Sequence, residues 1–191
     1  VNISRANANL LAFAKKQHVP VVTTIMGKGA IPTTSEYYVG NCGMHGKYAA
    51  NMAVSECDVL FSIGTRFNDR ITGDLNEFAP HAKIVHIDVD SAAISRNVVV
   101  DVPIVADADA ALEKLVEWAE PMDTKEWMEE IQAWDALHPL GMKRDGLSPQ
   151  MIMEHINKNF PKSIYVTDVG QHQMWATQYR ELDEDSQLIT S

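Results

Sequence analysis

Short apolar strands alternate with helix-like segments over the first 120 residues, and this alternation restricts the fold more than any other feature. VPVVTTI (19–25), DVLFSIG (58–64), KIVHIDVD (83–90) and PIVAD (103–107) read as strands. Helical patterns such as NLLAFAKKQH lie between them. Strands this apolar are buried on both faces, which is typical of a parallel sheet covered by helices on both sides. The sequence therefore predicts an α/β fold with an open, doubly wound parallel sheet over residues 1–120.

The next segment, residues 121–147, differs in composition because prolines and glycines surround the single helical pattern TKEWMEEIQAWDAL. Trp127, Ile131 and Trp134 are spaced to share one face of that helix. We expect a linker whose helix packs this apolar stripe against one neighbour.

A further unit is expected from Ser148, a good N-cap residue that is followed by Pro149 at the first helical position. The strand SIYVTDVG and the helix-like HQMWATQY come next. One strand and two helices cannot bury a core of their own. Residues 148–191 are therefore expected to be the first, truncated part of a second α/β domain.

Composition and charge restrict the partners. The net charge of -10 disfavours nucleic acid and anionic membranes, which are bound through clustered Lys and Arg. No window approaches the ~20 apolar residues of a membrane span. Cys42 and Cys57 lack CxxC spacing, so neither a disulfide framework nor a zinc site is expected. These features favour a cytoplasmic protein with small-molecule partners.

Ligands of open parallel sheets bind beyond the carboxyl ends of the strands, so the loops there are the candidate sites. Gly40, Gly43 and Gly46 surround Met44 and His45 just before a predicted helix. Glycine permits positive φ and close approach of a ligand, and a helix N-terminus offers free N–H groups to an anion. The alternative is plain turn geometry, with His45 as a hydrogen-bonding loop residue.

The loop GTRFNDRITGD (64–74) carries Arg66 and Arg70 at the end of a buried strand. The planar guanidinium suits phosphates and carboxylates. The alternative is a solvated loop with an internal Arg–Asp pair.

Acidic residues end two later strands. Asp88 or Asp90 could accept ribose hydroxyls, as acidic residues do in doubly wound nucleotide sites. Alternatively, Asp90 or Ser91 could cap a short helix. Asp107 has the same two interpretations.

Taken together, the loops resemble one enzyme family. TTIMGKGAIP, GNCGMHGKYAAN, GTRFNDRITGD, HIDVDSAAISRN and VTDVGQHQMWATQY are similar, in order and spacing, to motifs in the large catalytic subunit of the acetolactate (acetohydroxyacid) synthases, a family of thiamine-diphosphate enzymes. The resemblance covers nearly the whole chain. GTRFNDR discriminates best, since an RFDDR-type loop belongs to members that contain FAD; Asn68 replaces the usual Asp and leaves both arginines in place.

The resemblance implies a Rossmann-like (DHS-like) middle domain that holds a largely structural FAD at residues 1–120. It also implies outer domains that hold thiamine diphosphate and Mg²⁺ between the subunits of a dimer or tetramer, and a separate small regulatory subunit. The family condenses two pyruvates to 2-acetolactate and CO₂, or pyruvate with 2-oxobutyrate to 2-aceto-2-hydroxybutyrate, in valine, leucine and isoleucine biosynthesis.

Residue by residue, the resemblance implies three sets of contacts. Arg70 matches a residue that orients the substrate carboxylate, and Asp69 lies near the substrate channel. Gln171 and His172 match the site of the thiamine diphosphate. The FAD contacts match Thr24, Ile25, Met26, Met44, His45, Gly46, Gly64, Thr65, Arg66, Asp88, Val89, Asp107 and Ala108.

The family's activating Glu and its magnesium-binding GDG-to-Asn segment match nothing in this sequence, so no metal ligand is assigned and the chain alone is expected to be inactive. Two alternatives remain. One is another thiamine-diphosphate enzyme, such as pyruvate oxidase, oxalyl-CoA decarboxylase or glyoxylate carboligase. The other is a non-catalytic module that binds NAD or a partner protein.

Overall fold

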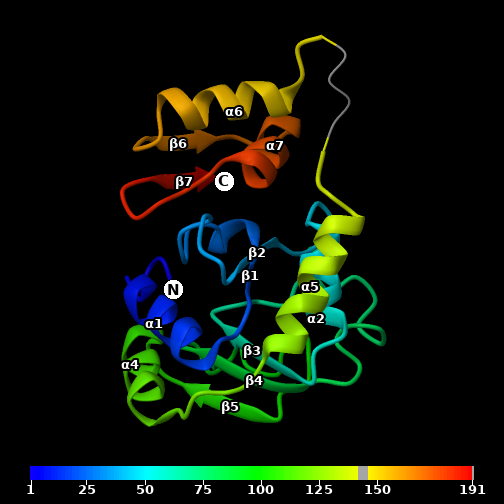
Figure 1. Ribbon diagram of the computed structural model, residues 1–191. Coiled ribbons are helices and arrows are strands. Elements are labelled where there is room, and N and C mark those ends of the chain that lie inside the picture. Colours follow the sequence, from blue (N-terminus) through cyan, green and yellow to red (C-terminus); the bar gives the residue numbers. More distant parts are fainter. Residues whose placement is uncertain (142–145, 191) are drawn as a thin grey trace.

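The computed structural model describes residues 1–141 and 146–190 and shows two units (Figure 1). The larger, lower one is the central unit, and the smaller, upper one is the second unit. The central unit comprises α1 (Asn7–Gln17), β1 (Val21–Thr23), η1 (Ile25–Gly27), β2 (Tyr38–Asn41), α2 (Tyr48–Ser55), β3 (Val59–Ile63), α3 (Asp69–Thr72), β4 (Lys83–Asp88), β5 (Val102–Val105) and α4 (Ala108–Trp118). α5 (Lys125–Leu137) runs along it, and the second unit comprises α6 (Pro149–Asn159), β6 (Ile164–Thr167), α7 (Gln171–Tyr179) and β7 (Gln187–Thr190).

Every strand pair is parallel, which confirms the predicted α/β class. β1 pairs with β2, β4 lies between β3 and β5, and β6 pairs with β7. Among the described residues, no helix is long and apolar enough to cross a membrane.

The central strands form two sheets instead of one. The orders β1-β2 and β3-β4-β5 describe two separate parallel ladders, and no strand pairing joins β1 to β3 within residues 1–141 and 146–190.

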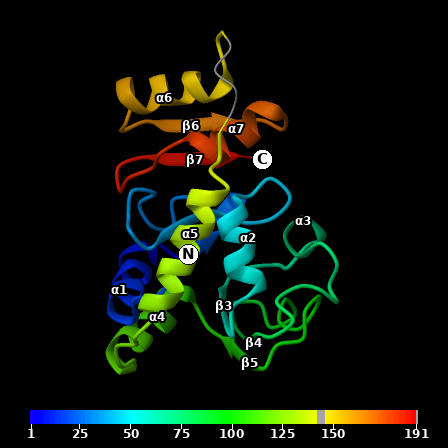
Figure 2. The same cartoon turned by 45° about the vertical axis from the view of Figure 1, so that its right-hand side comes forward.

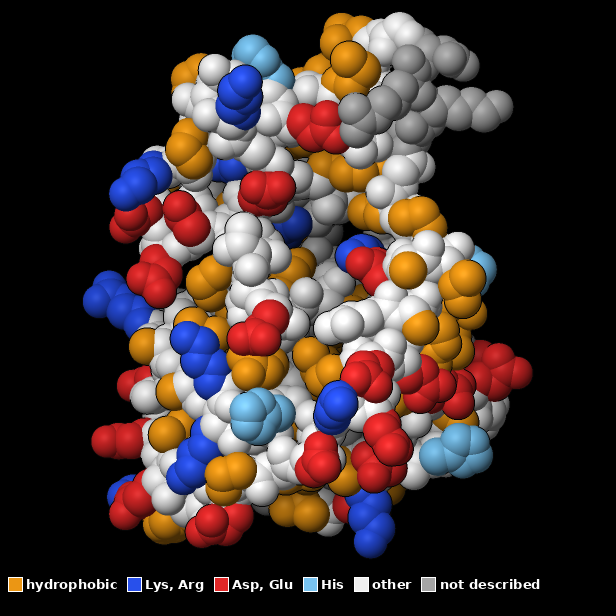
Figure 3. All heavy atoms as spheres, viewed as in Figure 1, with side chains coloured by type: hydrophobic (Ala, Val, Ile, Leu, Met, Phe, Trp, Pro, Cys, Tyr) orange, Lys and Arg blue, Asp and Glu red, His pale blue; other side chains and the backbone are white. Residues whose placement is uncertain are grey.

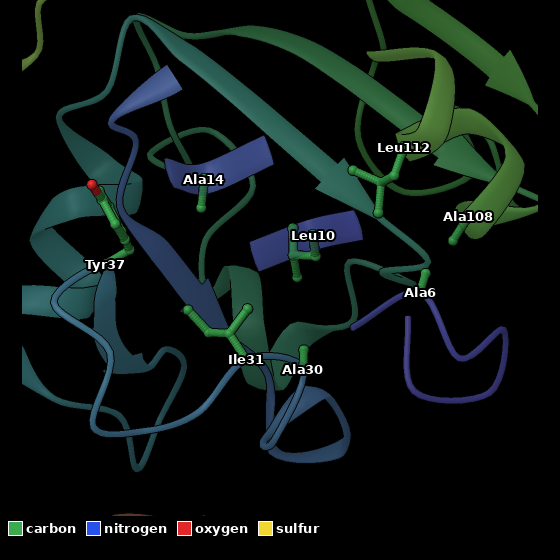
Figure 4. Packing of buried hydrophobic residues seen from close by; sticks show 8 residues of the cluster. All are labelled: Ala6, Leu10, Ala14, Ala30, Ile31, Tyr37, Ala108 and Leu112. Atoms are coloured by element: carbon green, nitrogen blue, oxygen red, sulfur yellow. The ribbon is translucent and has the colours of Figure 1, made fainter. Parts of the chain in front are cut away.

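Helices nevertheless cover both faces of β1. Val21 packs against a cluster that contains Leu10 of α1 and Leu112 of α4 (Figure 4). Val22, the next residue, packs against a second cluster, which contains Ala50 of α2 and Ile131 of α5. Successive strand residues point to opposite faces, so α1 and α4 form one layer and α2 and α5 the other.

The predicted start of α6 and the α5 stripe are present. Ser148 Oγ accepts a hydrogen bond from Met151 N (3.3 Å), and Pro149 is the first residue of α6. Trp127 and Trp134 meet edge to face, with ring centroids 5.5 Å apart. Both pack with Ile131 against α2.

Several short elements were not predicted. β2 contains Gly40 at a φ of 148°, α3 is a single turn, and β7 comes from QLIT, a segment left unassigned by its pattern. Residues 91–95 form turns and no helix, although Asp90 Oδ1 accepts from Ala92 N (2.9 Å) as a cap would. Part of the expected linker, residues 142–145, lies outside the described residues.

Leu112 tests the α1–α4 layer because it is fully buried (0% exposed) between the two helices and the sheet. We expect Leu112→Ala to lower the free energy of unfolding by about 2–5 kcal/mol, measured by urea denaturation. Leu137→Ala is the control, since Leu137 is 73% exposed on α5, and should change it by less than about 0.5 kcal/mol. Equal effects of the two substitutions would contradict this packing.

Candidate functional site

The loops that follow β1 to β4 are joined to one another at the carboxyl edge of the central strands. Asn41 Nδ2 donates to Thr24 O (2.9 Å), linking the end of β2 to the end of β1. Met44 N donates to Arg70 O (2.9 Å), and Gly64 N donates to Ile87 O (2.8 Å). The predicted site residues of these loops therefore belong to one connected edge.

The loop after β1 is capped by its own threonine. Thr24 Oγ1 accepts from Gly27 N (3.1 Å) and so begins the short helix η1. Ile25 is half-buried, whereas the Met26 side chain is 63% exposed at the edge.

The loop after β2 needs glycine at two positions. Gly43 has a φ of 97°, and a Cβ there would lie 2.6 Å from Arg70 O. A Cβ on Gly46 would lie 2.4 Å from Asn41 O. These close approaches turn Met44 and His45 outward, and both are exposed. The glycine spacing thus reflects tight backbone contact within a turn. Met44 and His45 are exposed in that turn.

The arginine loop is solvated. Arg66 is exposed, and its carbonyl oxygen accepts from Asn97 Nδ2 (2.9 Å). Asp69 and Arg70 belong to α3, where Oδ2 and Nε are 4.0 Å apart and both side chains are more than two-thirds exposed. An ion pair this exposed contributes little to stability. The Arg70 guanidinium remains accessible to an anion.

The acidic strand ends differ from each other. Asp107 caps α4 by accepting from Asp109 N (2.9 Å) and Ala110 N (3.4 Å). A hydrogen bond from the Ser4 side chain, then those backbone amides, lowers the pKa of Asp107. Ala108 is buried in the core, so it could offer a ligand only its backbone.

Asp88 is half-buried, and its Oδ1 accepts from Asp90 N (2.9 Å). The following Val89 side chain is 67% exposed. Asp88 thus accepts a loop amide at Oδ1, with its Oδ2 3.9 Å from His86 Nε2, whereas Asp107 accepts two amides of α4 and a hydrogen bond from Ser4.

The edge fits a flavin dinucleotide by its chemistry. Three large apolar side chains, Met26, Met44 and Val89, are exposed together with polar groups at the ends of β1, β2 and β4. Apolar side chains beside a few placed polar groups suit planar rings, and the exposed Arg66 guanidinium suits a diphosphate.

The second unit carries the other predicted pair. Gly170, with a φ of 151°, precedes α7, and Gln171 and His172 are exposed at its first turn. The free N–H groups of a helix N-terminus fit a diphosphate. α7 reaches the central unit at its other end, where Gln178 Nε2 donates to His45 O (3.0 Å).

A cleft of about 470 Å³ lies between the loop after β2 and the α3 region. Met44, Asp69 and Arg70 line it together with Phe78 and Cys42, a residue that had no role in the sequence-based prediction. Burial raises the pKa of the Cys42 thiol to about 11, so the thiol is neutral. Within residues 1–141 and 146–190, no cluster of three or more His, Cys, Asp or Glu could hold a metal ion.

His86 is a further residue that sequence reasoning missed. It is fully buried in β4, its ring meets that of Phe67 edge to face at 5.1 Å, and Nε2 lies 3.9 Å from Asp88 Oδ2. Burial lowers its pKa, opposed by the Asp88 charge. KIVHIDVD was predicted as a strand, but that prediction gave no role to His86.

The comparisons with known proteins identify the family of the chain. Residues 1–115 match the family described as thiamine pyrophosphate enzyme, central domain. The chain belongs to this family.

Within this family, the chain is similar to acetolactate synthase large subunits. The chain is 39% identical to the acetolactate synthase large subunit of Cyanidium caldarium, over 99% of this chain and 34% of that protein. It is 41% identical to the acetolactate synthase large subunit of Corynebacterium glutamicum, over 97% of this chain and 31% of that protein. It is 42% identical to the probable acetolactate synthase large subunit of Methanocaldococcus jannaschii, over 94% of this chain and 32% of that protein. The resemblance to acetolactate synthase large subunits is confirmed, and the chain spans about a third of these relatives' length.

Gly43→Ala tests the contact between the two loops. An added Cβ 2.6 Å from Arg70 O must displace the Met44–Arg70 hydrogen bond, at a φ that alanine rarely adopts. We expect a loss of more than about 1 kcal/mol in unfolding free energy and faster amide exchange of residues 69–73. Gly141→Ala is the control, since nothing lies within 4 Å of its Cβ position, and a similar loss there would contradict the contact.

The burial of His86 predicts that the stability of the fold depends on pH. The pKa of His86 is lowered in the folded state, so below about pH 6.5 the unfolded chain binds more protons than the folded chain. The free energy of unfolding therefore falls as the pH falls below that value, by at most ~1.4 kcal/mol per pH unit. Urea denaturation at pH 7, 6 and 5 should show a shallower pH dependence for His86→Phe. His155→Gln, which removes an exposed histidine, should retain the wild-type slope. Identical slopes for wild type and His86→Phe would refute this assignment.

Proposed function

We propose that the chain is a piece of an acetolactate synthase large subunit that carries the FAD site and part of the thiamine-diphosphate site. The observation that carries the proposal is the connected carboxyl edge, which brings together the loops after β1 to β4 in a chain about 40% identical to such subunits. In domain terms, residues 1–120 are the FAD-binding domain, 121–147 the linker and 148–191 the start of the thiamine-diphosphate domain.

The flavin would lie along the edge. Arg66 would neutralise its diphosphate, and the carboxylate of Asp88 would accept a hydroxyl of the adenosine half. The exposed side chains of Met26 and Met44 would contact its rings. Asp107 and Ala108 would contribute through position and backbone, because the carboxylate of one caps α4 and the side chain of the other is in the core.

Chemistry at the substrate would involve the same edge. The solvated guanidinium of Arg70, on the wall of the cleft, would orient a 2-oxo-acid carboxylate, and Asp69 would line its approach. Gln171 and His172 would hold the diphosphate of the thiamine cofactor at the start of α7. When bound, that cofactor supplies the carbanion chemistry that joins two 2-oxo acids.

The full enzyme would convert two pyruvates to 2-acetolactate and CO₂, or pyruvate with 2-oxobutyrate to 2-aceto-2-hydroxybutyrate, in the cytoplasm. A homo-oligomer, a regulatory subunit and Mg²⁺ belong to the same proposal. Figure 3 shows acidic side chains over much of one face, in keeping with the net charge of -10, so a small anion would be attracted by local arginines and not by the overall field. The 191 residues alone should form no acetolactate.

The deciding experiment is a calorimetric titration of the chain with FAD and, in parallel, with NAD, together with flavin fluorescence quenching. We expect FAD alone to bind, and Arg66→Gln to weaken it about tenfold or more, since a charge-assisted hydrogen bond contributes roughly 1.5–3 kcal/mol. Lys83→Gln, at the amino end of β4, is the matched control and should bind FAD normally. Binding of NAD with FAD ignored would favour a nucleotide-binding module, and binding of neither would show that these residues do not form the flavin site by themselves.

A further inference from the structure

Lys28 is a buried cation that the proposed function does not use. It follows η1 in the loop after β1, and its side chain is almost completely buried, with 4% of the residue exposed. Its Nζ donates to the backbone oxygen of Thr177 in α7. A residue of the central unit thus contacts a helix 149 positions away in sequence.

The Thr177 carbonyl is one that the helix itself leaves unpaired. In α7, Ala176 O accepts from Arg180 N (3.0 Å), but Glu181 N, the next donor of the ladder, is turned to Asn157 Oδ1 (3.1 Å). The last carbonyls of a helix need hydrogen-bond donors from outside the helix. Lys28 supplies that partner from the other unit.

Further contacts surround this bond. Thr33 N donates to Leu182 O (2.8 Å), and Leu182 N donates to Thr33 Oγ1 (2.8 Å). Leu182 is 1% exposed, and a Cβ on Gly29 would lie 3.2 Å from its Cδ1. Residues 28–33 and 177–182 form what we call the docking contact. The loop after β1 lies directly beneath the second unit in both ribbon views (Figures 1 and 2), and Figure 3 shows basic side chains within the recess between the units.

Charge makes the docking contact sensitive to protons. Burial lowers the pKa of Lys28 to about 7, and repulsion by Arg180 and Lys47 adds to this, against an attraction from Glu181. A lysine released to solvent would titrate near 10.4. Between about pH 7 and 10 the undocked state therefore binds more protons than the docked state, so raising the pH through this window favours docking, and the gain is absent below it.

We propose that Lys28 is a positioning residue that holds α7 against the loop after β1, as a proton-dependent tether between the two units. The tether itself depends only on the contacts above. Its consequence, that Gln171 and His172 at the start of α7 are held in place relative to the flavin loop, rests on the proposed function.

Hydrogen exchange of the intact 191-residue chain at pH 6.0, 7.0 and 8.0, corrected for the intrinsic rates, tests the tether. We expect the protection of residues 176–182, relative to α2, to rise by up to about tenfold between pH 7.0 and 8.0 and to change little between 6.0 and 7.0. The wild-type profile requires no variant, so it stays informative even if a substitution prevents folding.

Two variants and one control separate the tether from a purely structural role. Lys28→Met has no proton to lose, and Lys28→Arg keeps its charge throughout this range, so both should abolish the rise in protection. Lys16→Met removes the same kind of bond at the end of another helix, Lys16 Nζ to Val116 O (2.7 Å) within the central unit, and should keep the rise.

A flat wild-type profile, or the same rise in Lys28→Met, would overturn the proposal. FAD titration is independent of it: binding of NAD with FAD ignored, while the pH-dependent docking is intact, would contradict the proposed function alone.

Discussion

The contacts between the β1-β2 pair and the β3-β4-β5 sheet are the interactions on which the rest of the central unit depends. In the part of the chain that the structure describes, no backbone ladder joins the two sheets, so side-chain packing and loop contacts hold them together. Phe13 of α1 stacks on Phe61 of β3 with ring centroids 5.5 Å apart, and Val21 and Ile63 pack against the same cluster. The carboxyl edge adds the hydrogen bond from Met44 N to Arg70 O, which joins the loop after β2 to α3. The candidate site is thus also a structural joint.

This double role explains the glycines. At Gly43 the backbone approaches Arg70 so closely that no Cβ fits, and the same approach exposes Met44 and His45. A loop that contacts another loop this closely has little freedom in sequence. The two interpretations left open by the sequence, turn geometry and ligand binding, are therefore compatible at this loop.

Much of the fold could be predicted because its signals are local. Apolar runs marked β1, β3, β4, β5 and β6, and the Ser148–Pro149 pair marked the start of α6. β2 escaped because Gly40 interrupts its pattern, and the α3 turn because four residues carry no periodicity. The site residues could be grouped by their place after strands, but whether an aspartate binds or caps could not, since Asp88 and Asp107 differ only in what surrounds them.

The contacts between the units lay beyond any local pattern. Lys28 stands in an ordinary-looking GKG turn, and only folding brings it to the unpaired carbonyl of Thr177. Arg180 is likewise buried at the end of α7, where it donates to Asn157 Oδ1 (2.7 Å) and to the backbone oxygens of Phe160 (2.8 Å) and Pro161 (3.0 Å). Carbonyl and amide oxygens replace part of the water that these two buried basic side chains lose, although Arg180 Nε has no hydrogen-bond partner. The C-terminal end of α7 is therefore fixed by both units, whereas Gln171 and His172 at its N-terminal end are exposed.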